Sequence, residues 1–410
     1  MKRWIWFVVG AVIASPFILI QVRNFRARSL LGEQLQLARN EGIPTNATEY
    51  LAMIKAANDQ ENAAPIYQAL RSHRPNSEHV RKAYLTLLSK GYSDDAQRVL
   101  GENAEALELI DKAVLRPRCW FDRPWERGAA VLLPELADMK FVAKLVSLRG
   151  AVAASRGDTR AALADANAIF VIAKHSGEEP HAISHMVRDV IYMIGLHALA
   201  DWSFRFRNPE YITELKKRLA AFPEPDLRAE QAGELWNALS LIELMRTPQG
   251  RSEIGIKESD MPAIERAAPL IFNQGAARVN MVKHFREYWA ALNDPKKNDA
   301  KLTQAMDDME RDMIAFPAAA DVYSKLSSGG ETGGSLSSYA LDRINQHTAR
   351  VQQYTAVVRA LSEKVIPRKI RTDDLPSPFG GPPLEYRFDG KQIVIEGPGP
   401  DRKLTILGDP

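Results

Sequence analysis

The stretch that decides the fold is Ala129–His175, which reads AAVLLPELADMKFVAKLVSLRGAVAASRGDTRAALADANAIFVIAKH. Up to Arg156 its apolar residues recur at spacings of three and four, which is the period of one helix face. The tripeptide Gly157-Asp158-Thr159 ends this first helix and caps a second one that runs to His175. The repeating apolar positions of the first helix are Leu132, Leu133, Leu136, Met139, Val142, Leu145 and Leu148.

This pair of helices resembles one unit of a tetratricopeptide-type repeat. Gly150, Gly157 and Ala162 fall near that repeat's small-residue positions, where two helices pack closely. Arg149 stands where the repeat usually has an apolar residue, and no second unit follows in register. The resemblance implies TPR-like hairpins within an irregular α-helical array, whose stacked helix pairs would present concave surfaces to peptide or protein partners.

Helical periodicity continues on both sides of this pair. Pro75-Asn76-Ser77 supplies a turn and an N-cap before one helix, and Pro180 stands at the start of another. The sequence therefore predicts a mainly α fold. The expected helices of the body cover residues 23–39, 47–70, 79–88, 103–115, 129–156, 160–175, 180–204, 209–221, 227–245, 263–292 and 301–315.

The segment Trp4–Ile20 (WIWFVVGAVIASPFILI) contains no charged residue. A membrane span needs about 20 apolar residues, so Trp4–Val22 is at the short end of the range for an N-terminal transmembrane helix. The alternatives are a buried core helix and a cleaved signal peptide, with Lys2-Arg3 before the apolar run and Val12-Ile13-Ala14 as the small-residue site. Phe17–Ile20 continue the apolar run past that site, which favours an uncleaved single-pass anchor that contacts the lipid bilayer through residues 4–22.

The charges that flank this segment are nearly balanced, with Lys2 and Arg3 before it and Arg23, Arg26 and Arg28 after it. A very short basic N-terminus usually stays in the cytoplasm. We therefore expect a protein of the bacterial inner (cytoplasmic) membrane with its N-terminus inside and its body extracytoplasmic.

Composition excludes several classes of function. The 410 residues carry a net charge of +3, with 54 Lys and Arg against 51 Asp and Glu, so no concentrated basic face indicates nucleic-acid binding. The single cysteine, Cys119, excludes an intramolecular disulfide and cysteine-based zinc sites. Asn46-Ala47-Thr48 fits a glycosylation sequon, but such triplets are common and we interpret it as an ordinary loop.

The C-terminal part begins with the Gly- and Ser-rich segment Ser327–Ser338, which predicts a linker. Tyr339–Ile366 then carries a helical apolar face, and Pro367 stops this helix. Asp389-Gly390 between two alternating runs is the signal of a β-hairpin with a two-residue turn, and residues 403–407 would add a third strand. A hairpin alone is marginal in water, so it is expected to pack on the preceding helix. The two-residue turn pairs Tyr386 with Ile393 and Leu384 with Ile395.

The segment Leu375–Arg387 (LPSPFGGPPLEYR) resembles the C-terminal end of type II secretion pseudopilins, in which a long helix and a proline-rich segment precede a short β-meander. Ser377 stands where those proteins usually have an aspartate before proline. The pseudopilin processing pattern is missing before the apolar run at the N-terminus. The resemblance implies an envelope-assembly or secretion component.

Arg116–Gly128 (RPRCWFDRPWERG) concentrates aromatic residues between two helices, and its prolines argue against a continuous helix. One interpretation is an ordered loop whose aromatic side chains fill the core. The other is a binding loop that presents Trp120 and Trp125, because aromatic loops are frequent at recognition sites. Cys119 beside these aromatics is more typical of a small buried apolar residue than of a nucleophile.

His181 and His185 are four residues apart on a predicted helix, a spacing that can chelate a metal, and Glu178, Glu179 and His175 are close in sequence. The alternative is that they are solvated or core histidines, so no metal, cofactor or catalytic residue is assigned. The acidic run Asp307, Asp308, Glu310 and Asp312 fits a solvated helix face, and Gly397-Pro398-Gly399-Pro400 lacks the free amides of a phosphate loop.

These observations divide the chain into a membrane anchor (1–28), an α-helical body (29–326), a Gly/Ser linker (327–338) and a long helix with a β-hairpin tail (339–410). We expect a membrane-tethered scaffold or adaptor that binds another protein of unknown identity. A pseudopilin-like envelope component is the alternative. A second alternative is an enzyme whose site cannot be recognised from the sequence, with His181 and His185 as its only shortlist.

Overall fold

The computed structural model describes residues 27, 29–53, 61–73, 76–90, 93–244, 247–255, 274–313, 339–362, 369–371, 385–388, 392–396 and 403–407. Most of them are helical, which confirms a mainly α fold. Contacts between Cα atoms divide the chain into two compact units, each of which is built from three separate segments. Unit 1 takes its described residues from Met1–Ile54, Arg123–Leu132 and Leu227–Leu341, and unit 2 from Lys55–Asp122, Leu133–Asp226 and Asp342–Pro410.

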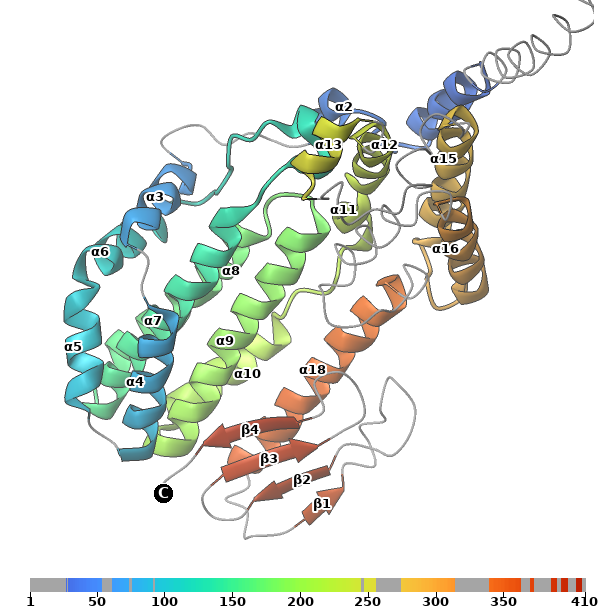
Figure 1. Cartoon of the computed structure of the whole chain (residues 1–410). Helices are drawn as coiled ribbons and strands as arrows, with labels where there is room; N and C mark the ends of the chain where they lie inside the picture. Colours follow the sequence, from blue (N-terminus) through green and yellow to red (C-terminus); the bar gives the residue numbers. More distant parts are fainter. Residues whose placement is uncertain are drawn as a thin grey trace, which may run out of the picture. The chain divides into compact units, whose positions relative to one another are not determined.

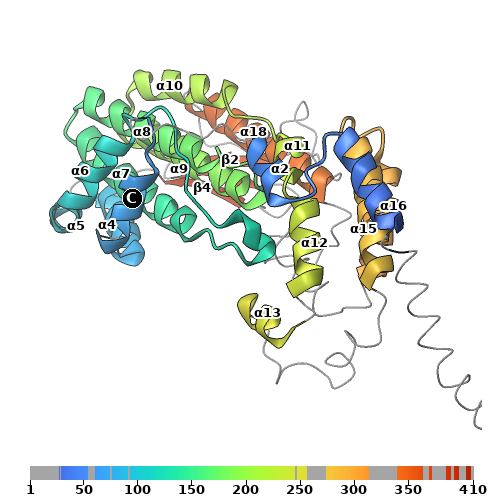
Figure 2. The same ribbon diagram turned by 90° about the horizontal axis from the view of Figure 1, so that it is seen from above.

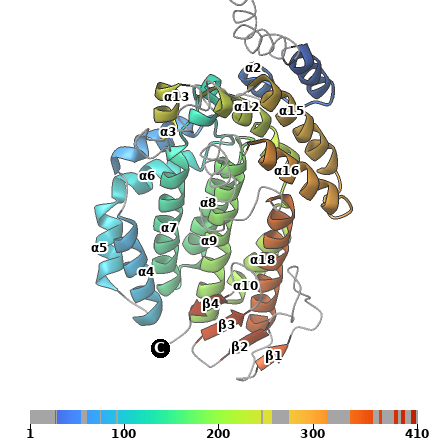
Figure 3. The ribbon, with the colours of Figure 1, turned by 45° about the vertical axis from the view of Figure 1, so that its right-hand side comes forward.

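Unit 2 is a helical body to which a small sheet is added. Helices α7 to α10 lie side by side in Figures 1 and 3, and each contacts the next along the chain. Its helices are α3 (Ala64–Ala69), α4 (Ser77–Lys90), α5 (Asp94–Glu102), α6 (Ala104–Ala113), α7 (Pro134–Ser155), α8 (Thr159–Ser176), α9 (Ala182–Phe206), α10 (Pro209–Ala220) and most of α18 (Tyr339–Ser362).

The predicted helix pair is present as α7 and α8. Gly157 ends the first helix with φ of +76°, a conformation that glycine adopts without strain, and Asp158 caps the second by accepting from Ala161 N at 3.0 Å. The predicted start at Ala129 was wrong, because α7 begins at Pro134. Leu132 precedes this helix and is 76% exposed, so it does not contribute to the apolar face.

Close packing around Gly150 explains why a small residue lies in the middle of α7. A Cβ atom placed there would lie 2.4 Å from Cη2 of Trp202 on α9. The neighbouring Arg149 contacts Asp111 on α6 at 2.7 Å and Asp165 on α8 at 2.6 Å. These ion pairs join α7 to both α6 and α8.

The C-terminal sheet is an antiparallel meander with strand order β1-β2-β3-β4. The predicted hairpin and third strand are present as β2, β3 and β4, and the sequence did not predict β1. Buried residues of β3 and β4 share one hydrophobic cluster with Tyr354 and Val357 of α18, and β4 also contacts α9. The strands are β1 (Lys369–Arg371), β2 (Glu385–Phe388), β3 (Gln392–Glu396) and β4 (Lys403–Leu407).

The predicted hairpin register is wrong by two residues. Phe388 pairs with Ile393, and Tyr386 pairs with Ile395 instead of Ile393. Four residues therefore separate the last pair, where the Asp-Gly signal predicts two.

Unit 1 contains shorter helices. The predicted continuous helix 227–245 is divided into α11 and α12, and a Cβ on the intervening Gly233 would lie 3.0 Å from the Tyr50 ring. Arg286 of α15 contacts Glu41 and donates to Gln34 at 2.8 Å, which attaches the helix of residues 29–40 to α15 (Figure 2). The remaining elements are α2 (Ala47–Ala52), η2 (Trp125–Ala130), α11 (Leu227–Gln231), α12 (Glu234–Leu244), α13 (Pro248–Glu253), α15 (Gln274–Ala291) and α16 (Asp299–Met313).

Several predicted segments lie outside the described residues: Trp4–Val22, the linker Ser327–Ser338 and Gly397–Pro400. In the part of the chain that is described, no helix is both long and apolar enough to cross a membrane. Asn46 of the sequon caps α2, because its side chain accepts from Glu49 N at 2.9 Å. A structural role therefore accounts for this asparagine.

Candidate binding loop

The segment Arg116–Trp120 of unit 2, here called the clamped loop, follows α6 and runs beside Glu61–Ala63. Arg118 N donates to Glu61 O at 3.2 Å, and Ala63 N donates to Arg118 O at 2.8 Å. This is an isolated parallel bridge, in which two short extended segments satisfy each other's backbone groups.

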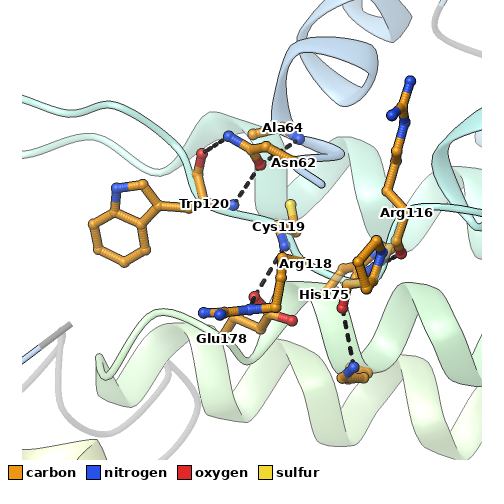
Figure 4. A network of polar contacts seen from close by, with 10 residues as sticks. Asn62, Ala64, Arg116, Arg118, Cys119, Trp120, His175 and Glu178 are labelled. Carbon is orange, nitrogen blue, oxygen red and sulfur yellow. Dashed lines mark hydrogen bonds and ion pairs between the residues drawn. The ribbon is translucent and has the colours of Figure 1, made fainter. Parts of the chain in front are cut away.

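The side chain of Asn62 extends this pairing to Trp120 (Figure 4). Asn62 Nδ2 donates to Trp120 O at 2.7 Å, and Trp120 N donates to Asn62 Oδ1 at 2.8 Å. The same Oδ1 accepts from Ala64 N at 3.0 Å, at the start of α3. One amide side chain thus binds both backbone groups of Trp120 and fixes them to a helix start.

The end of α8 holds the opposite side of the clamped loop. Lys174 Nζ donates to Pro117 O at 3.0 Å. Just past the helix end, Glu178 Oε2 accepts from Cys119 N and from Arg118 Nε, both at 2.9 Å. Together with the pairing to Glu61–Ala63, these bonds occupy most of the backbone donors and acceptors of the loop, so contacts within the folded chain fix its conformation.

His175 forms the most buried part of the network and is 1% exposed. Its Nε2 lies 3.0 Å from Arg116 O, and because a carbonyl can only accept, Nε2 carries the proton. Nδ1 is then the acceptor and receives the hydroxyl proton of Tyr67 at 3.0 Å. Burial lowers the pKa of His175 and raises that of Tyr67 well above its usual range, so both groups are neutral at pH 7.

Side chains of the clamped loop and the residues after it alternate between the core and the surface. Cys119 and Phe121 are fully buried in the main hydrophobic cluster, whereas Trp120 is half-buried and Asp122 is exposed. In Figure 4 the Trp120 indole extends away from the network, and the Arg118 guanidinium lies beside Glu178. This alternation is the period-two pattern of an extended segment.

The core-filling interpretation of Arg116–Gly128 is correct for part of the segment. Cys119, Phe121 and Trp125 are buried, as the core-filling interpretation predicts, and Trp125 packs edge-on against Tyr50 in unit 1 at 5.2 Å. Of the two tryptophans proposed for recognition, Trp120 is half-buried and Trp125 is buried.

The two candidate metal ligands have structural contacts at the start of α9. His181 is the N-cap, and its Nδ1 accepts from Ile183 N at 3.2 Å, so the helix starts later than Pro180 suggested. His185 is buried, with its Nδ1 3.4 Å from Arg188 Nη1. Within the described residues, no group of three or more His, Cys, Asp or Glu side chains is arranged to hold a metal ion.

The acidic run of Asp307, Asp308, Glu310 and Asp312 lies on α16. Of these side chains only that of Asp308 is described, and it is partly exposed.

Sequence reasoning missed Asn62, Tyr67 and Glu178 as parts of the site. Asn62 and Trp120 are 58 residues apart, and Tyr67 and His175 are 108 apart, so no local pattern joins them. The signal that was available was the cluster of aromatic residues and the single cysteine around Trp120. It identified the loop but none of the side chains that hold it.

No family model, curated protein or solved structure matches this chain. A rigid backbone that carries a half-buried indole suits recognition of another molecule, because large aromatic side chains on pre-ordered segments contribute strongly to interfaces.

Proposed function

We propose that this protein is a membrane-tethered α-helical scaffold or adaptor that binds a protein partner through Trp120 on the clamped loop. The observation that carries the proposal is the hydrogen bonding of Arg116–Trp120, which fixes the backbone around a half-buried indole. The helical body supplies the rigid support, through α3 on one side of the loop and the end of α8 on the other.

Pre-ordering of the loop favours binding for an entropic reason. Fixing the backbone of one residue costs about 1–2 kcal/mol, and a mobile loop would lose that free energy each time a partner bound. In the clamped loop this ordering is already complete in the folded chain. An indole that becomes fully covered at the centre of an interface typically contributes about 2 kcal/mol or more.

The proposed location is the bacterial inner membrane, with residues 4–22 as the anchor and the body outside the cytoplasm. The support is the uncharged segment Trp4–Ile20. Protease treatment of spheroplasts, probed with a C-terminal tag, tests this orientation. We expect the protease to remove the tag. Protection of the tag until the spheroplasts are lysed would contradict an extracytoplasmic body.

The binding proposal is tested by placing a photo-crosslinking amino acid at position 120 of the full chain in membranes. We expect a discrete crosslinked adduct. An excess of the untagged wild-type chain should suppress it by competing for the same partner. In parallel pull-downs, Trp120→Ala should lose the same partner and Asn62→Ala should weaken its recovery, since that variant loosens the loop but keeps the indole. Leu85→Ala is the matched control, because Leu85 is an exposed apolar residue of α4 away from the loop. Equal recovery of the partner by Trp120→Ala and wild type would refute the proposal.

The second candidate function is a pseudopilin-like envelope or secretion component. The observation that favours it is the order of elements at the C-terminus, where the long helix α18 precedes the meander β1 to β4. Deletion of Leu375–Pro410 should then impair protein export, and normal export by cells with this truncation would exclude the idea.

A further inference from the structure

We propose that Arg228 and Trp289 form a binding site for a small oxyanion, whose charged group is a carboxylate or a phosphate. Both residues belong to unit 1, Arg228 on α11 and Trp289 on α15. The site is a second binding function of the chain and does not depend on the role proposed for Trp120.

The Arg228 guanidinium has few contacts in the part of the chain that the structure describes. Its carbon lies 5.0 Å from the centre of the Trp289 ring, and Nη2 donates to Trp289 O at 3.5 Å, which is long for such a bond. Among the described residues no carboxylate pairs with it, and its Nε is buried without an acceptor. This cation therefore has neither a counter-charge nor an acceptor for one of its buried N–H groups.

Trp289 supplies a second unsatisfied donor beside this cation. It is 5% exposed, and its Nε1 is buried with no acceptor among the described residues. The ring also stacks on Phe285 of the same helix, with 6.3 Å between the ring centres, so packing fixes its position. Native structures satisfy nearly all buried donors, and two such donors at one place indicate a ligand that accepts hydrogen bonds.

The chemistry of Arg228 selects an anion as that ligand. The guanidinium edge that carries Nε–H and Nη2–H matches two oxygens of one carboxylate or phosphate, and a neutral acceptor would leave the charge unpaired. Arg228 is half-buried, so the ligand can approach from solvent, and the bond that must give way is the long one to Trp289 O.

Two acidic residues near α15 face Tyr288, the neighbour of Trp289. Burial raises the pKa of Tyr288, and the charges of Glu234 and Glu230 raise it further, which places both carboxyl groups close to its hydroxyl. Successive side chains on a helix point about 100° apart. Neither carboxyl forms an ion pair with Arg228 in the described structure, so the charge of Arg228 is left for an added anion.

The test follows the indole N–H signals by NMR in the full detergent-solubilised chain, labelled with ¹⁵N at its seven tryptophans. Trp289→Phe identifies the signal of Trp289. Sodium acetate and sodium phosphate are titrated separately, and sodium chloride at the same ionic strength is the reference. We expect acetate or phosphate, but not chloride, to move the Trp289 signal downfield in a saturable way, because an N–H that gains an acceptor is deshielded. The anion that saturates the signal at the lower concentration identifies the preferred class.

Arg228→Gln should require at least tenfold more of that anion for the same shift. If this variant does not fold, Arg228→Lys replaces it, since lysine keeps the charge but lacks the planar pair of donors. Arg278→Gln is the matched control: Arg278 also lies on α15 and has a buried Nε without an acceptor, but it pairs with Glu243 at 2.6 Å. This control should titrate like the wild type. A Trp289 signal that does not move, that moves equally with chloride, or that titrates unchanged in the folded Arg228 variant would overturn the site.

Discussion

Replacement of Gly150 by alanine tests the reasoning about close helix packing. The added Cβ would lie 2.4 Å from Cη2 and 2.8 Å from Cζ2 of Trp202, and also 3.1 Å from Cβ of Asp165. Trp202 is fully buried and cannot turn into solvent, so α7 and α9 must separate or the indole must leave its rotamer. Overpacking on this scale costs about 3 kcal/mol, at the upper end of the usual range. Alanine's better helix propensity returns about 1 kcal/mol, and the net loss of stability should be about 2 kcal/mol.

The control is the same substitution at Gly101 on α5, where nothing lies within 4 Å of the new Cβ. At Gly101 no steric clash opposes the higher helix propensity of alanine, so Gly101→Ala should stabilise the chain by about 0.5–1 kcal/mol. Urea unfolding of the detergent-solubilised chain, followed by circular dichroism, measures both changes. The two variants should shift the midpoint in opposite directions.

A third variant identifies the clash itself. Trp202→Phe removes the outer indole ring whose atoms crowd Gly150, so the cost of Gly150→Ala should be smaller in that background. Additive effects of the two substitutions, or a stabilising Gly150→Ala, would show that the helices are not held at the separation that the structure shows.

Three further perturbations have defined outcomes. Arg343→Met removes a partner 2.8 Å from the buried carboxylate of Asp189, which keeps its contact with Arg188 at 2.9 Å, and should cost about 2 kcal/mol in urea unfolding, whereas Arg343→Lys should lose less. Burial raises the pKa of Glu234 to about 7, so between about pH 5 and pH 7 the folded chain keeps a proton that the unfolded chain has released. The free energy of unfolding should therefore fall by up to about 3 kcal/mol as pH rises, and Glu234→Gln should abolish that fall. A wild-type urea midpoint that is the same at pH 5 and pH 8 would contradict this prediction. Asn62→Ala exposes the backbone of Trp120 and should speed its amide hydrogen exchange at least tenfold, with no change expected at helix amides of α9.

The local parts of the fold could be predicted because their causes are local. Asn76 accepts from Glu78 N and His79 N at 3.0 and 3.1 Å, as the predicted N-cap requires, and Asp158 caps α8 in the same way. Gly157 ends α7 because its backbone adopts a left-handed conformation. Caps, turns and helix periodicity depend on residues within one or two turns of each other.

Predictions failed where a neighbouring element decides the outcome. Leu132 fits the apolar period of α7, yet Pro134 starts the helix after it and the leucine is exposed. The hairpin register differs from the predicted one by two residues, and the pair closest to the turn is Phe388 with Ile393. Periodicity identifies the face of an element, but contacts from elsewhere in the chain set its ends and its register.

The candidate site illustrates the same limit. The aromatic cluster predicted a special loop around Trp120, and the burial of Phe121 and Cys119 agrees with one of its two interpretations. Nothing near the loop in sequence indicated that Asn62 would bind the backbone of Trp120, or that Tyr67 would donate to His175. The membrane anchor, the linker and both family resemblances remain predictions.

By itself, then, the sequence determined the helical character of the chain, most helix boundaries near caps and glycines, and the presence of a C-terminal β element. Only the tertiary structure decided which glycine faces Trp202, how Arg149 is paired, and which side chains clamp the loop at Trp120. The physical reason is that secondary structure follows from hydrogen bonds and periodicity over a few residues. The clamp instead depends on donors and acceptors that come together when α3 and α8 pack around the loop, and their positions follow from the burial of the whole core.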